Sequence, residues 1–193
     1  MLFRSNTSKG REAAIKKLNA TDLKLISERD SRRKEIAKLL IDSKADLDLD
    51  DGYGSTALSQ SVYFNYENLA ILLIESGAKI DTKTGVYIDG PADITPVHRA
   101  TSSPAVLKAM LKRGAKVNVR SSDGDTPLHW AARANNVECV KLLLDAGADP
   151  LAKDEEGRFP KDWCWTSDLF ESPGDAEKKQ ITKLLQEAAK FKK

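Results

Sequence analysis

Two histidines and two cysteines are the first candidates in this sequence for acid–base, nucleophilic or metal-binding roles. His98 and His129 each end a Thr-Pro-x-His run, and a neutral imidazole can serve as a general base. Cys139 and Cys164 are too few for a disulfide scaffold, and they cannot form a zinc motif on their own. The chain shows no phosphate-binding loop, nucleophile elbow or zinc-ligand spacing. We therefore expect no enzyme, no cofactor and no metal site.

An acidic run, DLDLDDG at 46–52, is the nearest approach to a calcium-binding loop. The sixth position is Asp51 where a calcium loop requires glycine, and the twelfth is Ala57 where it requires glutamate. Solvated loop charge is the better interpretation.

The elements that must position these side chains form an internal repeat. GYGSTALSQSV (52–62), PADITPVHRAT (91–101) and SDGDTPLHWAA (122–132) align, and a partial copy begins at EGRFPKDWCW (156–165). Each full copy is followed by an apolar run and a glycine, as in ILLIESGAKID (71–81), AMLKRGAKVNV (109–119) and KLLLDAGADPL (141–151). This fixed phase between two motifs indicates a repeat architecture.

On these motifs the sequence resembles the ankyrin-repeat family over roughly residues 21–193, TPLHWAA followed by VKLLLDAGAD being the most specific pair. The resemblance implies an all-α solenoid of helix–turn–helix units joined by finger loops. We expect N-terminal helices and a capping repeat at 1–50, with residues 8–19 as an additional helix. Full repeats are expected at 51–81, 82–118 and 119–151, and a C-terminal capping repeat at 152–193.

The repeat residues have local physical roles. Thr95 and Thr126 can cap the first helix of a unit, and the proline after each suits a first helical turn. Gly77, Gly114 and Gly147 stand where the second helix ends and positive φ is needed. Leu72, Leu73, Leu111, Leu142 and Leu143 are expected to face neighbouring repeats, and Lys44 replaces the glycine in the first unit. The resemblance implies that both histidines bond locally within their turns, and both cysteines fit core positions.

In the family, finger tips and first helices bind protein partners. Carried over by position, the contacts are predicted at Tyr53, Tyr63 and Phe64 in the first full repeat, and at Asp123, Asp125 and Arg133 in the third. Related positions are Gly52, Ser55, Ile94, Ser102, Ser103, Ser122 and Ala134. Exposed aromatic side chains commonly act as anchors at interfaces. The alternative is that Tyr63 and Phe64 tuck under the loop between the helices.

The second full repeat has a longer finger. Gly77 and Thr95 are 18 residues apart, whereas Gly114 and Thr126 are 12 apart, so six residues are inserted within 81–94. The insert carries an apolar run, Val86, Tyr87 and Ile88, which either meets a partner or folds back onto the array.

Arg99, Trp130 and Trp163 occupy equivalent positions in successive units, which would allow cation–π stacking. Framework packing and a shared groove contact are both open for this column.

Charge is distributed unevenly along the chain. Residues 1–44 carry 12 basic and 6 acidic side chains and residues 175–193 carry 6 and 3, while the middle carries 13 and 20. The whole has a net charge of +2, which does not fit a generally cationic nucleic-acid binder. We expect one protein partner with a basic surface patch, an enzyme being one candidate, and consider nucleic-acid binding through Arg32, Arg33 and Lys34 a weaker alternative.

The sequence thus predicts a monomeric protein-interaction module that acts as a dedicated inhibitor or immunity-type protein, or alternatively as an adaptor bridging two proteins. No run of 18 apolar residues occurs and the N-terminus lacks an apolar signal region. We expect a cytoplasmic location, or the bacterial periplasm if a signal peptide has been removed.

Overall fold

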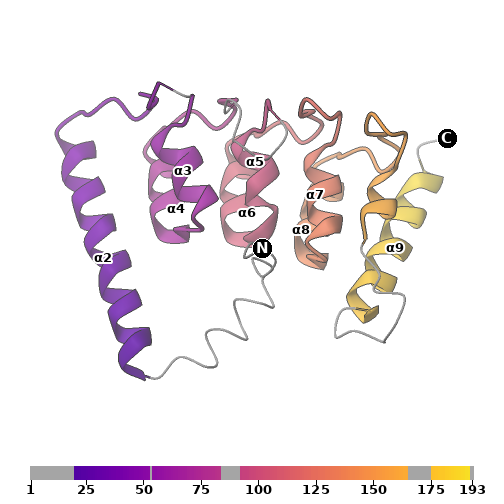
Figure 1. Ribbon diagram of the computed structural model, residues 1–193, viewed down its shortest axis with the longest axis horizontal. Helices are drawn as coiled ribbons and strands as arrows, with labels where there is room; N and C mark the ends of the chain where they lie inside the picture. The colour runs from indigo at the N-terminus through magenta and orange to yellow at the C-terminus, as the bar shows by residue number, and fades with distance from the viewer. Residues whose placement is uncertain (1–19, 53, 84–91, 165–174, 192–193) are drawn as a thin grey trace.

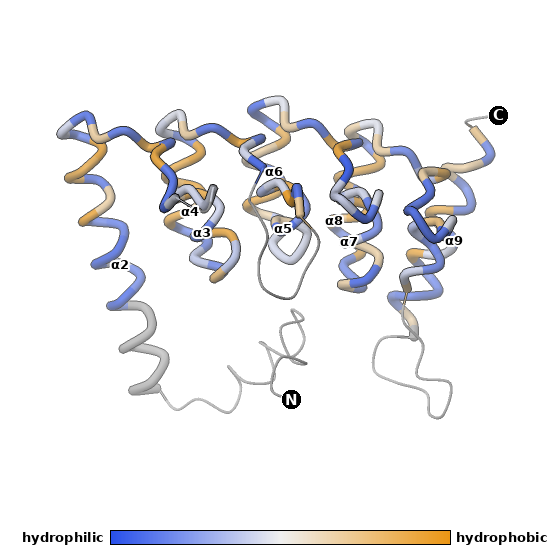
Figure 2. Tube along the Cα trace, turned by 45° about the horizontal axis from the view of Figure 1, so that its top comes forward, coloured by the Kyte–Doolittle hydropathy of each residue, from blue (hydrophilic) through white to orange (hydrophobic). Residues whose placement is uncertain are grey.

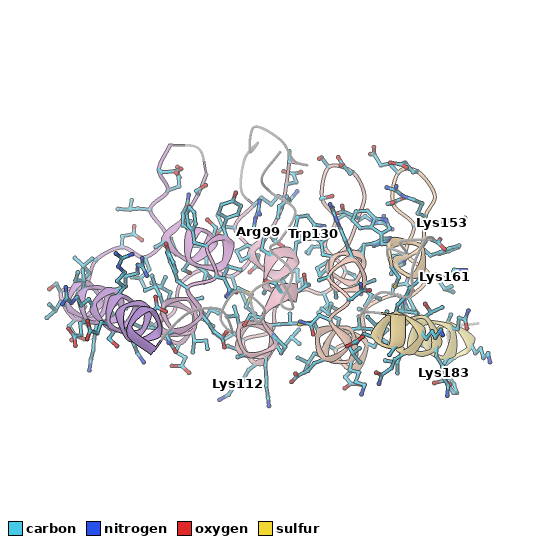
Figure 3. The ribbon with its side chains drawn as sticks, turned by 60° about the horizontal axis from the view of Figure 1, so that its bottom comes forward. Arg99, Lys112, Trp130, Lys153, Lys161 and Lys183 are labelled. Carbon is cyan, nitrogen blue, oxygen red and sulfur yellow. The ribbon has the colours of Figure 1, made fainter. Side chains whose placement is uncertain are left out.

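Two rows of short helices make up the array (Figures 1 and 3). The computed structural model describes residues 20–52, 54–83, 92–164 and 175–191, and leaves the side chains of 20–27 and 175 undescribed. The inner row consists of α3 (Ala57–Tyr63), α5 (Pro96–Arg99) with the 3-10 turn η1 (Ala100–Ser102), α7 (Pro127–Arg133) and the 3-10 turn η2 (Pro160–Trp163). The outer row consists of α2 (Ala20–Asp42), α4 (Glu67–Glu75), α6 (Pro104–Lys112), α8 (Val137–Asp145) and α9 (Asp175–Lys190). The predicted all-α repeat architecture is confirmed.

Each helix packs on its own partner and on the equivalent helix of the next unit. The outer row contacts run α2–α4–α6–α8–α9 and the inner row contacts run α3–α5–α7–η2. One apolar cluster extends from Leu58 in α3 to Leu185 in α9, with Leu107, Leu128 and Leu143 fully buried between them. The hydrophobic segments in Figure 2 accordingly recur in every unit. Helices this short gain their stability from stacking rather than from their own propensity.

Threonine caps start the inner helices, as the sequence predicted. Thr56 accepts a hydrogen bond from the amide of Ser59, and Thr95 and Thr126 form reciprocal capping boxes. Pro96 and Pro127 follow at the first helical positions, where no amide hydrogen bond is lost.

The N-terminal unit differs from a full repeat. Where the sequence showed a second-helix pattern at 31–48, the structure has one helix of 23 residues, α2, which ends at Asp42. Lys44 adopts φ 64° at the position of the missing glycine, so the turn keeps its left-handed backbone without one. Ile36, Leu39 and Leu40 on α2 are 60%, 67% and 54% exposed. Within the described residues, no helix combines the length and the apolarity that crossing a bilayer requires.

Backbone hydrogen bonds join successive fingers. The amide of Glu155 donates to the carbonyl of Asp123 (3.0 Å), and the amide of Ser122 donates to the carbonyl of Ala92 (3.0 Å). The Asn118 side chain donates to the Gly147 carbonyl (3.0 Å) and accepts from the amide of Asp149 (2.8 Å). These bonds add to the packing of the helices in holding successive fingers in register.

Gly147 and Gly124 both adopt positive φ, but only Gly124 is also close to a neighbouring backbone atom. Gly147 ends α8 at φ +86°, and an added Cβ would meet no atom within 4 Å. Gly124 has φ +74°, but an added Cβ would lie 3.0 Å from the Glu155 amide nitrogen that joins two fingers. Gly147→Ala is expected to lower the free energy of unfolding by about 1 kcal/mol, the cost of a left-handed alanine.

We expect Gly124→Ala to cost about 1 kcal/mol more than Gly147→Ala, because the finger contact must also shift. Urea denaturation followed by circular dichroism measures both variants. Equal losses would show that the close approach at Gly124 does not limit stability.

Candidate protein-binding site

Both candidate general bases are structural. The Nδ1 atom of His98 accepts hydrogen bonds from the Thr95 amide (3.2 Å), and its Nε2 lies 3.4 Å from the carbonyl oxygen of Asp125. Because an amide can only donate and a carbonyl can only accept, the ring is neutral and carries its proton on Nε2. His129 repeats the pattern with the Thr126 amide (3.1 Å) and the Arg158 carbonyl (3.2 Å). Each ring therefore caps its own helix and holds the base of the next finger.

Burial suppresses protonation of both rings. His98 and His129 are completely buried, and burial lowers the pKa of His98 to about 4 against an opposing effect from Asp125. Burial also lowers the pKa of His129, with the Arg158 carbonyl acting in the opposite direction. Rings that are buried, neutral and fully hydrogen-bonded cannot exchange a proton with a substrate.

The cysteines occupy the core, as predicted. Cys139 in α8 and Cys164 after η2 are both free and buried. Burial raises the pKa of Cys139 to about 12, and burial likewise raises that of Cys164. Neither thiol provides a reactive thiolate at neutral pH.

Four carboxylates of the acidic run at 46–51 accept hydrogen bonds from backbone amides, and Asp48 does so from Lys79 of the next finger (2.7 Å). Asp46 accepts from the amide of Asp48, Asp50 from that of Gly52, and Asp51 from that of Ser55. In the part of the chain that the structure describes, no group of three or more histidine, cysteine, aspartate or glutamate side chains is arranged to hold a metal ion.

An aromatic cluster lies at the end of α3. Tyr63 is 37% and Phe64 55% exposed, and their rings meet edge to face at 5.0 Å. Phe64 also stacks on Tyr66 at 5.7 Å, and the guanidinium of Arg33 from α2 lies 4.1 Å from the centre of the Tyr66 ring. The two predicted contact residues therefore stay exposed instead of tucking under the loop.

Arg99 connects this cluster to the next repeats. Its guanidinium lies 4.7 Å from the centre of the Tyr63 ring and 5.9 Å from that of Trp130. Figure 3 shows Arg99 and Trp130 side by side on the inner row. The predicted cation–π contact between positions 99 and 130 is confirmed, and Tyr63 extends it to the first full repeat.

Trp163, at the equivalent position of the last unit, has a different environment. Its indole donates a hydrogen bond to Asp154 (2.8 Å), and the guanidiniums of Arg133 and Arg158 lie 5.8 Å and 5.2 Å from its ring. Asp154 also accepts from the backbone amide and side chain of Arg158, both at 2.8 Å. Burial acts to raise the pKa of Asp154, but these hydrogen bonds outweigh it and lower the pKa to about 2.

The predicted contact at Asp125 is wrong. Asp125 is 1% exposed, and its carboxylate accepts a hydrogen bond from the Ser121 hydroxyl (2.5 Å) at the base of the finger. Ser55 and Ile94, at the matching place before the helix cap, are also buried, and Ser103 is buried as the cap of α6. The chain turns inward before each inner-helix cap, so Ser55, Ile94 and Asp125 are buried at the base of a finger, whereas Ser103 is buried as a helix cap.

The other predicted contacts divide into two groups. Asp123 and Arg133 are exposed, the first at a finger and the second at the end of α7. Tyr53, Val86, Tyr87 and Ile88 lie outside the described residues.

The sequence reasoning did not identify Tyr66 and Arg33 as members of the aromatic cluster. Tyr66 stands two residues after Phe64, which is the signal that could have suggested it. At the other end of the array, Lys153 and Lys161 flank Phe159, their Nζ atoms lying 5.1 Å and 5.6 Å from its ring centre.

The buried histidines predict a dependence of stability on pH. The pKa of His98 is about 4 in the folded chain and 6.5 as an ordinary value, so the unfolded chain binds more protons between these limits. The contribution of the neutral histidines to the free energy of unfolding should be fully present above pH 6.5. It should fall as the pH drops towards 4, by up to about 1.4 kcal/mol per pH unit for each histidine. Denaturation midpoints measured from pH 7.5 to 4.5 test this.

His98→Gln is the matched variant, because glutamine at this capping position can still accept from the Thr95 amide but does not titrate. We expect a shallower loss of stability in the variant than in the wild type over this window. Parallel pH profiles would contradict the role given to His98.

Comparison with known proteins supports a repeat module. The family model described as Ankyrin repeat matches residues 123–155. The chain is 46% identical over 59 residues (31% of this chain, 8% of the relative) to an ankyrin repeat and LEM domain-containing protein 1 homolog of Caenorhabditis elegans. It is 31% identical over 126 residues (65% and 20%) to a putative ankyrin repeat protein of fowlpox virus, and 30% identical over 155 residues (73% and 13%) to Rabankyrin-5 of Mus musculus.

The chain thus spans a fifth or less of the length of these three relatives. Ankyrin repeats generally mediate protein–protein interaction. With the stacked helix pairs, the capping histidines and the fingers in place, the chain belongs to the ankyrin-repeat family.

Proposed function

We propose that this chain binds a protein partner through its inner helices and fingers, and that it acts by binding without turnover. The observation that carries the proposal is the exposed aromatic pair Tyr63 and Phe64, 37% and 55% exposed at the end of α3. Large aromatic side chains held at a surface by neighbouring rings lose little conformational freedom on binding and bury much area.

We further propose that one partner is held and occluded, as by a dedicated inhibitor or immunity-type protein. The six-residue insertion within 81–94 supports this, because a finger longer than its neighbour can enter a cleft that the rest of the face covers. Aspartates at 46, 48, 50 and 51 give the first finger an acidic character. A partner with a basic patch opposite that finger would associate faster.

An adaptor that bridges two proteins is the second candidate. It is favoured by three exposed aliphatic residues of α2, Ile36, Leu39 and Leu40, which could contact a second protein besides the one at Tyr63 and Phe64. Binding of nucleic acid through Arg32, Arg33 and Lys34 has weaker support, because Arg33 already pairs with Asp30 at 2.8 Å and stacks on Tyr66.

Affinity capture from a lysate of the source organism tests the binding surface. We expect Phe64→Ala to reduce the amount of captured partner by about 30-fold, as for an interface residue worth about 2 kcal/mol. Phe191→Ala is the matched control, because Phe191 is an aromatic residue 90% exposed directly after α9, a helix of the outer row. Equal capture by Phe64→Ala and wild type would contradict the assignment of this surface.

The captured partner then separates occlusion from bridging. If the chain occludes its partner, adding purified chain should lower the partner's own activity, and alanines at Val86, Tyr87 and Ile88 should reverse the loss. An adaptor predicts two partners bound at once with no loss of activity. A ternary complex that also depends on Leu39 would replace the inhibitor proposal by the adaptor.

A further inference from the structure

Two of the three cationic residues on the inner helices, Arg133 and Lys161, lie in the third full repeat and the C-terminal capping repeat. We propose that this part of the surface takes an acidic segment of the partner, which runs along α7 and η2 with its carboxylates on Arg133 and Lys161. This inference rests on the proposed protein-binding function and adds the charge and the orientation of the partner.

The charges on the inner row have one predominant sign. α3, α5, η1, α7 and η2 carry three cationic side chains besides the neutral histidines, Arg99, Arg133 and Lys161. Asp162 is the single acidic residue in these helices, and it accepts a hydrogen bond from the amide of Phe159 (2.8 Å) while lying 3.9 Å from Lys161. The inner helices therefore carry three cationic side chains against one carboxylate, the exposed Asp162.

Arg133 differs from Arg113, Arg120 and Arg158 because its guanidinium N–H groups have no acceptor among the described residues. Arg113 donates to the carbonyls of Ile74 and Ala78, Arg120 to those of Gly124 and Lys153, and Arg158 to the carboxylate of Asp154. Arg133 is exposed and lies over the Trp163 ring at 5.8 Å. Within the described part of the chain, no carboxylate comes within ion-pair distance of it.

Stacking prepares Arg133 for an anion. A guanidinium held against a ring keeps its N–H groups in its own plane, available at the edge for a bidentate contact with a carboxylate. Less side-chain freedom is lost on binding than for a free arginine. Lys153 and Lys161, which flank Phe159, extend the same cation–aromatic arrangement to the end of the inner row (Figure 3).

The two ends of the face therefore differ. Tyr63, Phe64 and Tyr66 offer apolar contacts at the first full repeat, and Arg133 and Lys161 offer cations at the third and fourth. The acidic segment must follow the helices and avoid the finger tips, because Asp123 and Glu155 are exposed there. The basic patch proposed above would meet the first finger, so the partner has opposite charges at its two ends.

Nuclear magnetic resonance of the full chain labelled with nitrogen-15 tests the inference. The probe is a 12-residue peptide of three Glu-Gly-Leu-Glu units, compared with the same peptide carrying glutamine or lysine in place of glutamate. The indole N–H signal of Trp163, assigned with Trp163→Phe, should shift with the acidic peptide alone, and more weakly as salt rises.

Arg133→Gln should weaken binding of the acidic peptide about fivefold, as expected for an exposed charge pair. Lys112→Gln is the matched control, because it removes one positive charge from the exposed side of α6 on the outer row (Figure 3). It should change the Kd less than twofold, within the effect of long-range charge alone.

Three outcomes would overturn the inference: an unshifted Trp163 signal at millimolar acidic peptide, tighter binding of the lysine peptide, or equal effects of the two charge variants. Failure here leaves the proposed function standing if capture still depends on Phe64. If capture does not depend on Phe64 but the peptide response is intact, the aromatic surface is ruled out as the binding site and the cationic surface at Arg133 and Lys161 remains.

Discussion

The array depends on an imidazole ring that stays neutral in its interior. His98 and His129 each accept from the threonine that caps their own helix and donate to a finger carbonyl of the next repeat. A charged ring would place a second donor opposite the threonine amide, and burial makes that charge costly. One uncharged side chain therefore fixes both the start of an inner helix and the spacing to the following finger, and so sets the positions of the exposed side chains between them.

The base of a finger is held by different side-chain hydrogen bonds in different repeats. In the third repeat the Ser121 hydroxyl bonds Asp125, whereas in the last unit Asp154 bonds Arg158 with the acid and its partner exchanged in position. The difference also changes how the tryptophan of each repeat is hydrogen-bonded. Asp154 also accepts from the Trp163 indole, while the buried Trp130 indole nitrogen, with serine at the matching position, finds no acceptor among the described residues. Two tryptophans at equivalent positions are therefore held in unlike ways.

Features that depend on local backbone chemistry could be predicted from the sequence. The threonine caps and the positive-φ glycines follow from residue type and spacing, and the structure has them where expected. Of the leucines expected between repeats, Leu73 and Leu143 are in the core and Leu111 and Leu142 pack against it, whereas Leu72 is half-buried and outside this cluster. Asp125 could not be placed in this way, because its charge indicates a surface and only the tertiary turn into the helix buries it against Ser121. The contacts of Arg33 with Tyr66 and of Arg99 with Tyr63 join residues more than 30 positions apart, so they depend on how the units stack. The length of α2 was underestimated because its first turns lack the repeat motif.

Serine at the histidine position of the first full repeat has a consequence for how the solenoid comes apart. Among the described residues, Ser59 bonds only to Thr56 of its own cap, so nothing there corresponds to the ring that ties α5 and α7 to the next finger. Arg113 still joins the outer helices there, through the carbonyls of Ile74 and Ala78. A solenoid opens at its weakest junction, so heat or force should separate the inner helices of the first full repeat while the later repeats remain stacked. Tyr63 and Phe64 lie on that repeat. A ligand that binds them would stabilise its folded form and so delay the unfolding of the whole array.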